Sequence, residues 1–372
     1  MIADPGYGRA LWPVWRAVLR DYRGGRGHRA RARLGFLTPP EGRGRVIWVR
    51  AGAGQESLRV GTELVGAVRD RRRDVRIVLT FEQDDPVLLR SLLRPWPRVG
   101  IGYGPSDRPR VVTRVLGRFQ PCGIIVAEAV PPENLLRRTL APVAVVGAPA
   151  AAPVAIAWPV SADEHAGWSS AGVAGELMPA ADPQARFAEA QADVVLRAIA
   201  GAGERRLWWW HGRADRWPGW LAAWRAWEHS GEDILMVSLV DASAVPEASL
   251  RASAWDRSAL PGGTVLHIDE RRWYAAAASA AQGVHLAEIR RDVLWQALAA
   301  GCALSLGVEA TVSDLPVPRL DAPDSVIAQW RELRGNEALR RTQGDRARRR
   351  FWEERRQVDA NLATLMDRVW LW

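Results

Sequence analysis

A short loop of small residues is the first place in the sequence where chemistry could occur. It spans residues 51–57, directly follows the apolar run 46–49 and carries Glu56. Small residues let backbone N–H groups approach a ligand, and the start of a helix favours an anion. A carboxylate at this place could accept a proton from a hydroxyl group. Without further context, the simpler interpretation is that Glu56 is an acidic residue in the first turn of a helix, where it complements the helix dipole.

Alternating apolar runs and helical stretches predict the framework that positions this loop. We expect buried strands at 46–49, 75–80, 124–127 and 143–146, and again at 207–210, 234–239, 265–268, 283–286 and 303–306. Helices are expected at, among others, 217–229, 271–281 and 292–300. Strands that alternate with helices predict βαβ units in doubly wound sheets. Ligands bind beyond the carboxyl ends of such strands, where the Glu56 loop falls.

The length of 372 residues suits two domains of ordinary size. We predict a basic, partly helical arm at 1–44, a Rossmann-like domain at 45–150, a Pro- and Ala-rich linker at 151–190, a second Rossmann-like domain at 191–345 and a C-terminal helix at 346–372. Helix breaks are expected at Gly335 and Gly344. The uncharged window 139–162 contains too many prolines for a membrane-spanning helix.

Several collinear segments resemble the Kdo transferases, which move 3-deoxy-D-manno-octulosonic acid from CMP-Kdo onto the lipid A precursor. Residues 46–56 are similar to the family's segment IWVHAVSVGE, 103–121 to YLPYDLPxxVxRFLxRFRP, and 124–136 to LILVETELWPNLL. In the second half, 298–307 resembles AALGKPVLFG and 337–361 resembles the helical tail of the family. The resemblance covers most of the chain and is most specific in the first 150 residues.

This resemblance implies an α/β protein of the GT-B type, with two Rossmann-like domains facing a cleft and a C-terminal helix. The first domain would hold the acceptor and the second the nucleotide sugar. The implied function is an inverting, metal-independent transfer of a sugar from a CMP-activated donor to a lipid A-type acceptor. It implies no cofactor, because the CMP-sugar is the donor substrate.

The resemblance also assigns acceptor-side residues. Glu56 matches the glutamate that acts as general base on the acceptor hydroxyl, a role that a carboxylate within hydrogen-bond reach can perform. The other expected acceptor-side residues are Arg50, Gly54, Gln55, Ser57, Glu128 and Asn134. Arg50 replaces a histidine of the family, and Gly54-Gln55 replaces its Val-Gly pair.

The donor half departs further from the family. The expected donor-side residues are Ser238, Glu288, Gln296 and Gly301. Ser238 begins the segment in place of the family's PRH loop, and Glu288 lies in place of its GGS motif. Because a carboxylate near the CMP phosphate would repel it, an alternative is a catalytically degenerate, transferase-like scaffold or partner protein at the inner membrane.

Positive charge is concentrated at the start of the chain. Residues 1–50 contain eleven arginines and three acidic residues, a net +8 of the chain's +9. Apolar residues Leu11, Trp12, Trp15, Val18 and Leu19 among these arginines predict a short interfacial helix followed by a basic loop. We therefore expect an anionic lipid acceptor and peripheral contact with the cytoplasmic face of a Gram-negative inner membrane. A solvated terminus is the alternative, and nucleic acid is not expected.

Tryptophans recur at helical spacing at positions 217, 220, 224 and 227. This stripe predicts either a helix packed on the second sheet or an exposed surface that docks on a membrane or partner. Cys122 and Cys302 lie in apolar contexts and are expected to be small core residues in a reducing compartment. His165, His211 and His267 have no neighbour at metal or triad spacing.

Overall fold

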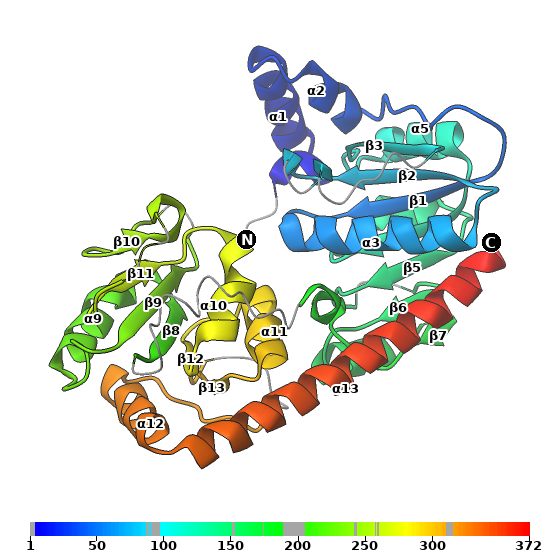
Figure 1. Ribbon diagram of the computed structural model, residues 1–372. Coiled ribbons are helices and arrows are strands. Elements are labelled where there is room, and N and C mark those ends of the chain that lie inside the picture. The colour runs from blue at the N-terminus through cyan, green and yellow to red at the C-terminus, as the bar shows by residue number, and fades with distance from the viewer. Residues whose placement is uncertain are drawn as a thin grey trace. The chain divides into compact units, whose positions relative to one another are not determined.

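A computed structural model describes residues 4–86, 89–90, 97–150, 153–173, 175–188, 205–241, 244–256, 258, 260–309 and 315–372. The chain forms two compact units (Figure 1). The first contains residues 1–183 and 357–372, and the second contains residues 184–356.

The described strands of the first unit form a parallel sheet in the order β3-β2-β1-β4-β5-β6-β7. Their bounds are β1 Val46–Ala51, β2 Arg76–Phe81, β3 Val99–Tyr103, β4 Pro121–Ala127, β5 Val143–Val146, β6 Ile156–Trp158 and β7 Glu176–Leu177. The four strands expected in this half are confirmed. The strand order changes direction between β1 and β4, the switch point at which doubly wound sheets bind ligands.

Helices cover both faces of this sheet. They are α3 Gln55–Arg71, α5 Pro109–Phe119, α6 Glu133–Arg138 and α7 Ala162–Ala171. Helix α3 packs on the face that carries Val49 and Leu79, both of which lie against Gly61. Helices α5, α6 and α7 cover the opposite face, where Trp48 meets Phe119 edge-on with ring centroids 5.4 Å apart. The buried Trp48 Nε1 donates to Thr80 Oγ1 at 2.8 Å, which leaves no polar group of this indole unpaired.

The segment expected to be a linker, residues 151–190, is instead largely part of the first unit. Strand β6 pairs with β5, and β7 pairs with β6, so this segment extends the sheet. Trp158 Nε1 donates to the Ala181 carbonyl at 2.7 Å, and Trp168 Nε1 donates to the Ala148 carbonyl at 2.8 Å. Strands of two and three residues are too short to give a hydrophobic pattern, and these tryptophans fix them in place.

The basic arm is folded onto the first unit. It contains the short helix η1 Pro5–Tyr7 and helices α1 Leu11–Arg23 and α2 Gly27–Arg33, so the expected helix is confirmed and the expected basic loop is a second helix. Figure 1 shows both helices beside the β3 end of the sheet. The fully buried Arg33 donates to Asp21 at 2.8 Å and to Asp4. Its carbonyl accepts from the backbone and hydroxyl of Ser106, which ties the arm to the domain.

The described strands of the second unit form a parallel sheet in the order β10-β11-β9-β8-β12-β13. Their bounds are β8 Leu207–Gly212, β9 Ile234–Leu239, β10 Leu250–Arg251, β11 Val265–His267, β12 Gly283–Leu286 and β13 Ala303–Leu306. The five strands expected here are confirmed, and β10 was not expected. The switch point of this sheet lies between β8 and β12.

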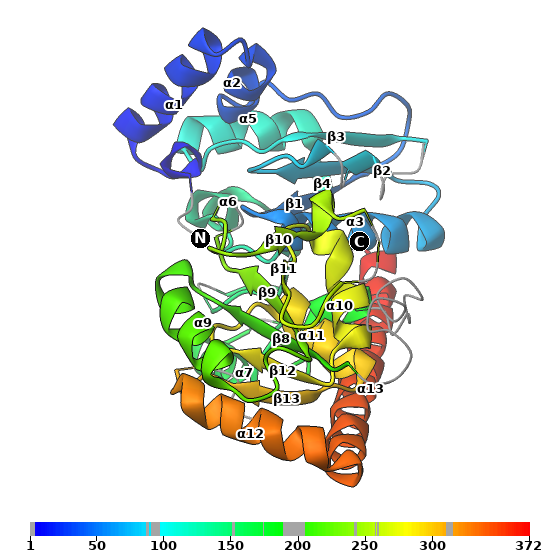
Figure 2. The same ribbon diagram turned by 60° about the vertical axis from the view of Figure 1, so that its left-hand side comes forward.

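The tryptophan stripe lies in the core of the second unit. Trp217, Trp220 and Trp224 lie on helix α9 Trp217–Ala226, and Trp227 follows it. All four are at most 3% exposed. Trp220 packs against Trp210 of β8 and against helix α12 Pro323–Gly335. Figure 2 shows α9 on one side of the sheet, and α10 Tyr274–Ala280 and α11 Arg291–Ala300 on the other. The stripe is therefore a packing surface, and the exposed alternative is wrong.

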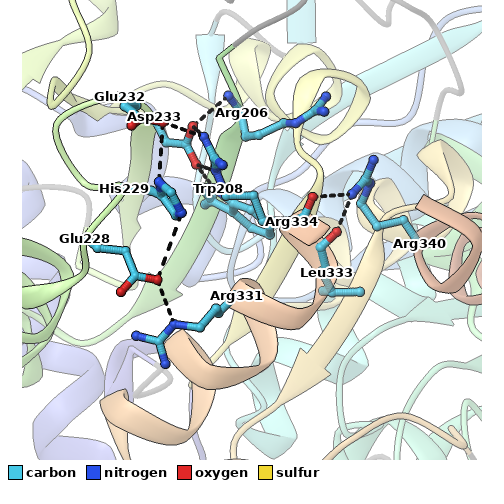
Figure 3. A network of polar contacts seen from close by, with 10 residues as sticks. All are labelled: Arg206, Trp208, Glu228, His229, Glu232, Asp233, Arg331, Leu333, Arg334 and Arg340. Atoms are coloured by element: carbon cyan, nitrogen blue, oxygen red, sulfur yellow. Dashed lines mark hydrogen bonds and ion pairs between the residues drawn. The ribbon is translucent and has the colours of Figure 1, made fainter. Parts of the chain in front are cut away.

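A buried carboxylate holds α12 at the amino ends of β8 and β9 (Figure 3). Asp233 is fully buried and accepts from the Arg206 backbone at 3.1 Å, Trp208 Nε1 at 3.0 Å and Arg334 Nε at 3.0 Å. Arg340 donates to the carbonyls of Leu333 and Arg334 at the end of α12. Because this network lies away from the carboxyl ends of the strands, its role is to hold the fold together.

The C-terminal helix α13 spans Glu337–Trp370, nine residues earlier than expected at its start. It follows the expected break at Gly335 but runs through Gly344. A Cβ at Gly344 would lie 2.4 Å from the Gly301 carbonyl oxygen, so glycine serves close helix packing here rather than a break. In the first unit, Arg72 donates to the carbonyls of Val369 and Trp370.

Candidate functional site

The loop that carries Glu56 lies at the switch point of the first sheet. In the register, Arg50 is paired with Thr80 of β2 and Val126 of β4. The chain then passes through Gly54, which caps α3, and Glu56 lies half-buried in the first turn of that helix. We call the side of each sheet where the strands' carboxyl ends lie its carboxyl edge.

Ser57 fixes this loop. Its buried hydroxyl donates to the Ala127 carbonyl at 2.7 Å and accepts from the Gly52 backbone, so it joins the loops after β1 and β4. Glu128 follows Ala127 and has a positive φ of 48°. Its Cγ would lie 3.0 Å from a Cβ at Gly147, which itself has φ +70°. The structure thus brings Glu56, Ser57 and Glu128 to one switch point.

A pocket of about 430 Å³ opens at the same carboxyl edge. Its lining includes the charged residues Asp4, Arg9, Arg50, Glu82, Asp107 and Glu133, together with Tyr7. The Glu82 backbone N–H faces the Gly52 carbonyl at 3.5 Å, so the pocket wall adjoins the Glu56 loop. The volume falls within the range of small-molecule sites.

Arg50 is the central cation of this pocket. It is 3% exposed, donates to the Pro105 carbonyl at 3.1 Å and pairs with Glu82 at 3.3 Å. Burial raises the pKa of Glu82, and Arg50 opposes that shift. Burial also raises the pKa of Asp107, which is opposed by the N–H of Asn134 and by Arg50. Perturbed carboxyl groups in a pocket are typical of functional sites.

One buried oxygen in the pocket wall, Asp107 Oδ1, has no hydrogen-bond partner among the described residues. A ligand with hydroxyl groups could satisfy it, since buried polar atoms are normally paired. Sequence reasoning missed Tyr7, Glu82 and Asp107 as site residues. For Glu82 a signal existed, because it closely follows the strand that the sequence predicts at 75–80.

Other expected acceptor-side residues have structural partners. Asn134 donates its side-chain amide to the Asp107 carbonyl at 2.7 Å and its backbone N–H to the Asp107 carboxylate at 3.2 Å. Gln55 donates to Asp85 in the loop after β2. These contacts position the pocket wall and the Glu56 loop relative to each other.

At the carboxyl edge of the second sheet, Ser238 and His211 bond to each other, while the buried His211 Nε2 has no hydrogen-bond partner among the described residues. Ser238, at the end of β9, accepts from Trp209 Nε1 at 2.9 Å and contacts His211 Nδ1 at 2.8 Å. Both Ser238 and His211 are fully buried. Burial lowers the pKa of His211 to about 3, so its imidazole is neutral. The hydroxyl of Ser238 is thus occupied by interior contacts.

The first turn of α11 is occupied by an internal carboxylate. Asp292 pairs with Arg290 at 2.6 Å and with Arg271 at 3.4 Å, and it accepts from the Val293 backbone at 2.9 Å. Burial acts to raise the pKa of Asp292, but the two arginines outweigh it and hold the pKa below its ordinary value. Glu288 lies half-buried between β12 and this turn.

The structure does not bring all expected donor-side residues together. Gln296 lies in the middle of α11 and donates to the Phe187 carbonyl at 3.3 Å. Gly301 follows the last residue of α11 with φ +74°, at the end of the helix remote from Glu288. Ser238 and Glu288 do share the carboxyl edge, because His211 of β8 is paired with both Ser238 and Leu286.

Two parallel α/β units, each with a switch point, and a C-terminal helix define a protein of the GT-B class. Residues 28–148 match the family model of 3-deoxy-D-manno-octulosonic-acid transferase (kdotransferase). The resemblance expected from the sequence is confirmed for this segment, which holds the Glu56 loop, Arg50, Glu82, Asp107 and Glu128. No curated protein sequence matches the chain.

Solved structures with about a tenth of residues identical share the fold. Arabidopsis thaliana UGT89C1 complexed with quercetin has a TM-score of 0.58 at 11% identity, covering 87% of this chain and 100% of that one. A ugt transferase from Siraitia grosvenorii in complex with UDP gives 0.56 at 11% identity, covering 87% and 99%. S. aureus MnaA with UDP gives 0.55 at 9% identity, covering 81% and 90%.

Proposed function

We propose that this protein is a glycosyltransferase of the Kdo transferase type, which moves a sugar from a CMP-activated donor to a lipid A-type acceptor with inversion and without a metal. The observation that carries the proposal is the position of Glu56. This residue lies beyond the carboxyl end of β1, at the switch point of the sheet and within the segment matched by the family model.

In the proposed reaction the acceptor hydroxyl oxygen attacks the anomeric carbon of the donor sugar. The new C–O bond forms as the bond from that carbon to the CMP phosphate breaks, and the phosphate oxygen keeps the electron pair. Glu56 accepts the hydroxyl proton as a general base. Such proton transfer contributes roughly 10²–10⁴-fold to the rate. A single displacement from the opposite face inverts the anomeric centre.

The pocket beside the Glu56 loop supports a sugar-like acceptor. Among the described residues, four carboxyl groups and two guanidinium groups line it, and such groups bind hydroxyls from several directions. Its excess of acidic groups disfavours phosphate, so we assign it the hydroxyl-rich part of the acceptor. The phosphates of a lipid A-type molecule would meet the arginines of the arm instead.

Glu56→Gln tests the catalytic part of the proposal. We expect turnover of CMP-Kdo and a lipid A precursor to fall at least about a hundredfold with stability unchanged, because glutamine cannot accept the proton. Glu63→Gln is the matched control, since Glu63 is also half-buried on α3 two turns further along. Equal turnover of Glu56→Gln and the parent protein would exclude Glu56 as the base.

Helix α1 supports the proposed membrane contact. Val14, Ala17, Val18 and Asp21 face the protein, whereas Leu11, Trp12, Trp15, Leu19 and Tyr22 are between 45% and 75% exposed. Aromatic residues favour the membrane interface, and nearby arginines each contribute about 1 kcal/mol at an anionic leaflet. None of the described helices is long and apolar enough to cross a membrane.

Binding to anionic liposomes tests this contact. We expect Trp12→Ser/Trp15→Ser to lose most binding, and high salt to weaken binding by the parent protein. Trp352→Ser is the control, because Trp352 is 55% exposed elsewhere on the chain. Deletion of the whole arm is not a clean test, since Arg33 and Asp21 are buried in the first unit. Equal binding by all three proteins would leave the arm without a membrane role.

A second candidate, the non-enzymatic scaffold, is favoured by the carboxyl edge of the second unit. There Asp292 occupies the first turn of α11, the kind of place where a phosphate would bind. Calorimetric titration with CMP distinguishes the two candidates. Micromolar binding supports the transferase, and absence of heat at millimolar CMP supports the scaffold.

A further inference from the structure

A second pocket, of about 650 Å³, lies in the second unit and plays no part in the proposed transfer. It lies beside β13, the last strand of the sheet, and its walls come from three elements. These are the end of α11 with β13, the segment 315–318, and the α13 residues 343–353. Its size is that of a small-molecule site.

The pocket exists because the sheet stops at a proline. Beyond β13 the chain pairs with Leu306, whose N–H donates to the Pro318 carbonyl and whose carbonyl accepts from Leu320. In a parallel ladder the next bond would run from the N–H of residue 318 to the Leu304 carbonyl, but proline has no N–H. The segment 315–318 therefore separates from Leu304, and the pocket opens between them.

The floor of the pocket is apolar. Leu298, Cys302, Leu304, Leu315 and Ala347 line it, and each is at most 7% exposed. The Cys302 thiol donates to the Ala278 carbonyl at 2.9 Å, and burial raises its pKa to about 12. This cysteine is thus a small apolar wall residue, and the pocket offers aliphatic contacts in its depth.

The mouth of the pocket is cationic. Arg346 and Arg349 are exposed on α13 and have no ion pair or hydrogen bond with any described residue. By contrast Arg350 pairs with Glu354 at 2.8 Å on the same helix. Among the described residues of the lining, Glu353 is the one that is acidic, beside the three arginines Arg346, Arg349 and Arg350. The buried Gln343 Oε1 also lacks a partner among the described residues.

We propose that this pocket binds a free, single-chain anionic amphiphile, whose aliphatic chain fills the apolar floor and whose carboxylate, sulfate or phosphate lies between Arg346 and Arg349. The chain would gain by leaving water, and guanidinium groups bind such anionic oxygens in pairs of hydrogen bonds. Positive charge at the mouth over an apolar interior selects this class against neutral sugars and against nucleotides, which lack an aliphatic chain.

The probe is dodecyl phosphate below its critical micelle concentration, titrated calorimetrically into the full chain. We expect saturable binding that weakens at least tenfold in Arg346→Gln/Arg349→Gln. The matched control is Arg341→Gln/Arg356→Gln, which also removes two positive charges, but from exposed positions of α13 outside the pocket lining. It should bind the probe as the parent does. Ala347→Leu, which narrows the floor, should also weaken binding if its unfolding transition matches that of the parent.

Two further measurements distinguish this pocket from the exposed face of α1 and from a membrane-lipid site. Binding must persist in Trp12→Ser/Trp15→Ser, because otherwise the exposed face of α1 is the site. Binding to phosphatidylglycerol vesicles should not depend on Arg346 and Arg349, because otherwise the ligand is a membrane lipid rather than a free amphiphile. No saturable binding by the parent, or equal weakening in the control pair, would also overturn the proposal.

Discussion

The two sheets have related strand orders, but the polar groups at their carboxyl edges differ in their hydrogen-bond partners. In the first unit, Arg50, Glu82 and Asp107 line a pocket in which the buried Asp107 Oδ1 lacks a partner among the described residues. In the second, Ser238 and His211 bond to each other, and Asp292 is held by arginines. A polar group whose partners are internal contributes to folding, whereas one left over in a pocket is available to a ligand. Substitutions at the second edge should therefore change stability alone, whereas those at the first should also change activity.

The largest expected effect is that of Asp292→Ala. Removing this carboxylate leaves Arg290 and Arg271 without their shared partner, and breaking a buried pair costs about 3–5 kcal/mol. Denaturant unfolding followed by tryptophan fluorescence measures the loss, and Glu288→Ala on the preceding turn is the control. If Asp292→Ala instead kept its stability and bound CMP more tightly than the parent, the role of the carboxylate would be to hinder CMP binding at the donor site.

Acid should destabilise the second unit through His285. This imidazole stacks on Trp220, and burial lowers its pKa from 6.5 to about 3. Below pH 6.5 His285 therefore binds a proton in the unfolded chain but stays neutral in the folded chain, so the free energy of unfolding decreases as the pH falls. Each proton is worth about 1.4 kcal/mol per pH unit, which gives about 3 kcal/mol between pH 6.5 and about 4.

His285→Gln should remove only the part of this slope that His285 contributes, because His211, whose pKa burial also lowers to about 3, keeps its own part. Unfolding free energies measured from pH 7 to pH 4 would show the smaller slope. The same substitution at His165, half-exposed on α7, is the control for loss of an imidazole. An unchanged slope in His285→Gln would mean that the folded chain protonates His285 readily.

The sequence was sufficient to predict the strands that are continuously apolar and the stripe of tryptophans on one helix face. It was insufficient to predict β6 and β7, which are too short to show a pattern. It was also insufficient to predict that Gly344 lies within a continuous helix, because Gly301, against which it packs, is distant in the chain. Glu56 could be located because strand, small-residue loop and carboxylate are consecutive. Tyr7 and Asp107 could not, because only folding of the arm onto the sheet brings them into one pocket.

Glu82 should give the first unit the opposite pH dependence, and Glu82→Gln should remove it. Burial raises the pKa of Glu82, so the folded chain retains a proton that the unfolded chain has lost, and stability falls as the pH rises through that window. Relative to the parent, Glu82→Gln should therefore gain stability from pH 4 to pH 7, by no more than about 1.4 kcal/mol per pH unit. A flat difference between the two proteins would mean that Arg50 holds Glu82 ionised throughout.

The smallest expected effect separates backbone strain from the placement of Glu128. Gly147 and Gly25 both have φ +70°, but a Cβ at Gly147 would lie 3.0 Å from Glu128 Cγ, whereas a Cβ at Gly25 would meet nothing within 4 Å. Alanine in a left-handed conformation costs roughly 1–2 kcal/mol, so Gly25→Ala should lose about that much stability and keep full turnover. Gly147→Ala should lose more and also lower turnover, because Glu128 must move at the switch point that holds Glu56. Equal losses of stability with unchanged turnover in both variants would show that Glu128 has no part in the site, and the contrast between the two carboxyl edges would then rest on the Arg50 pocket alone.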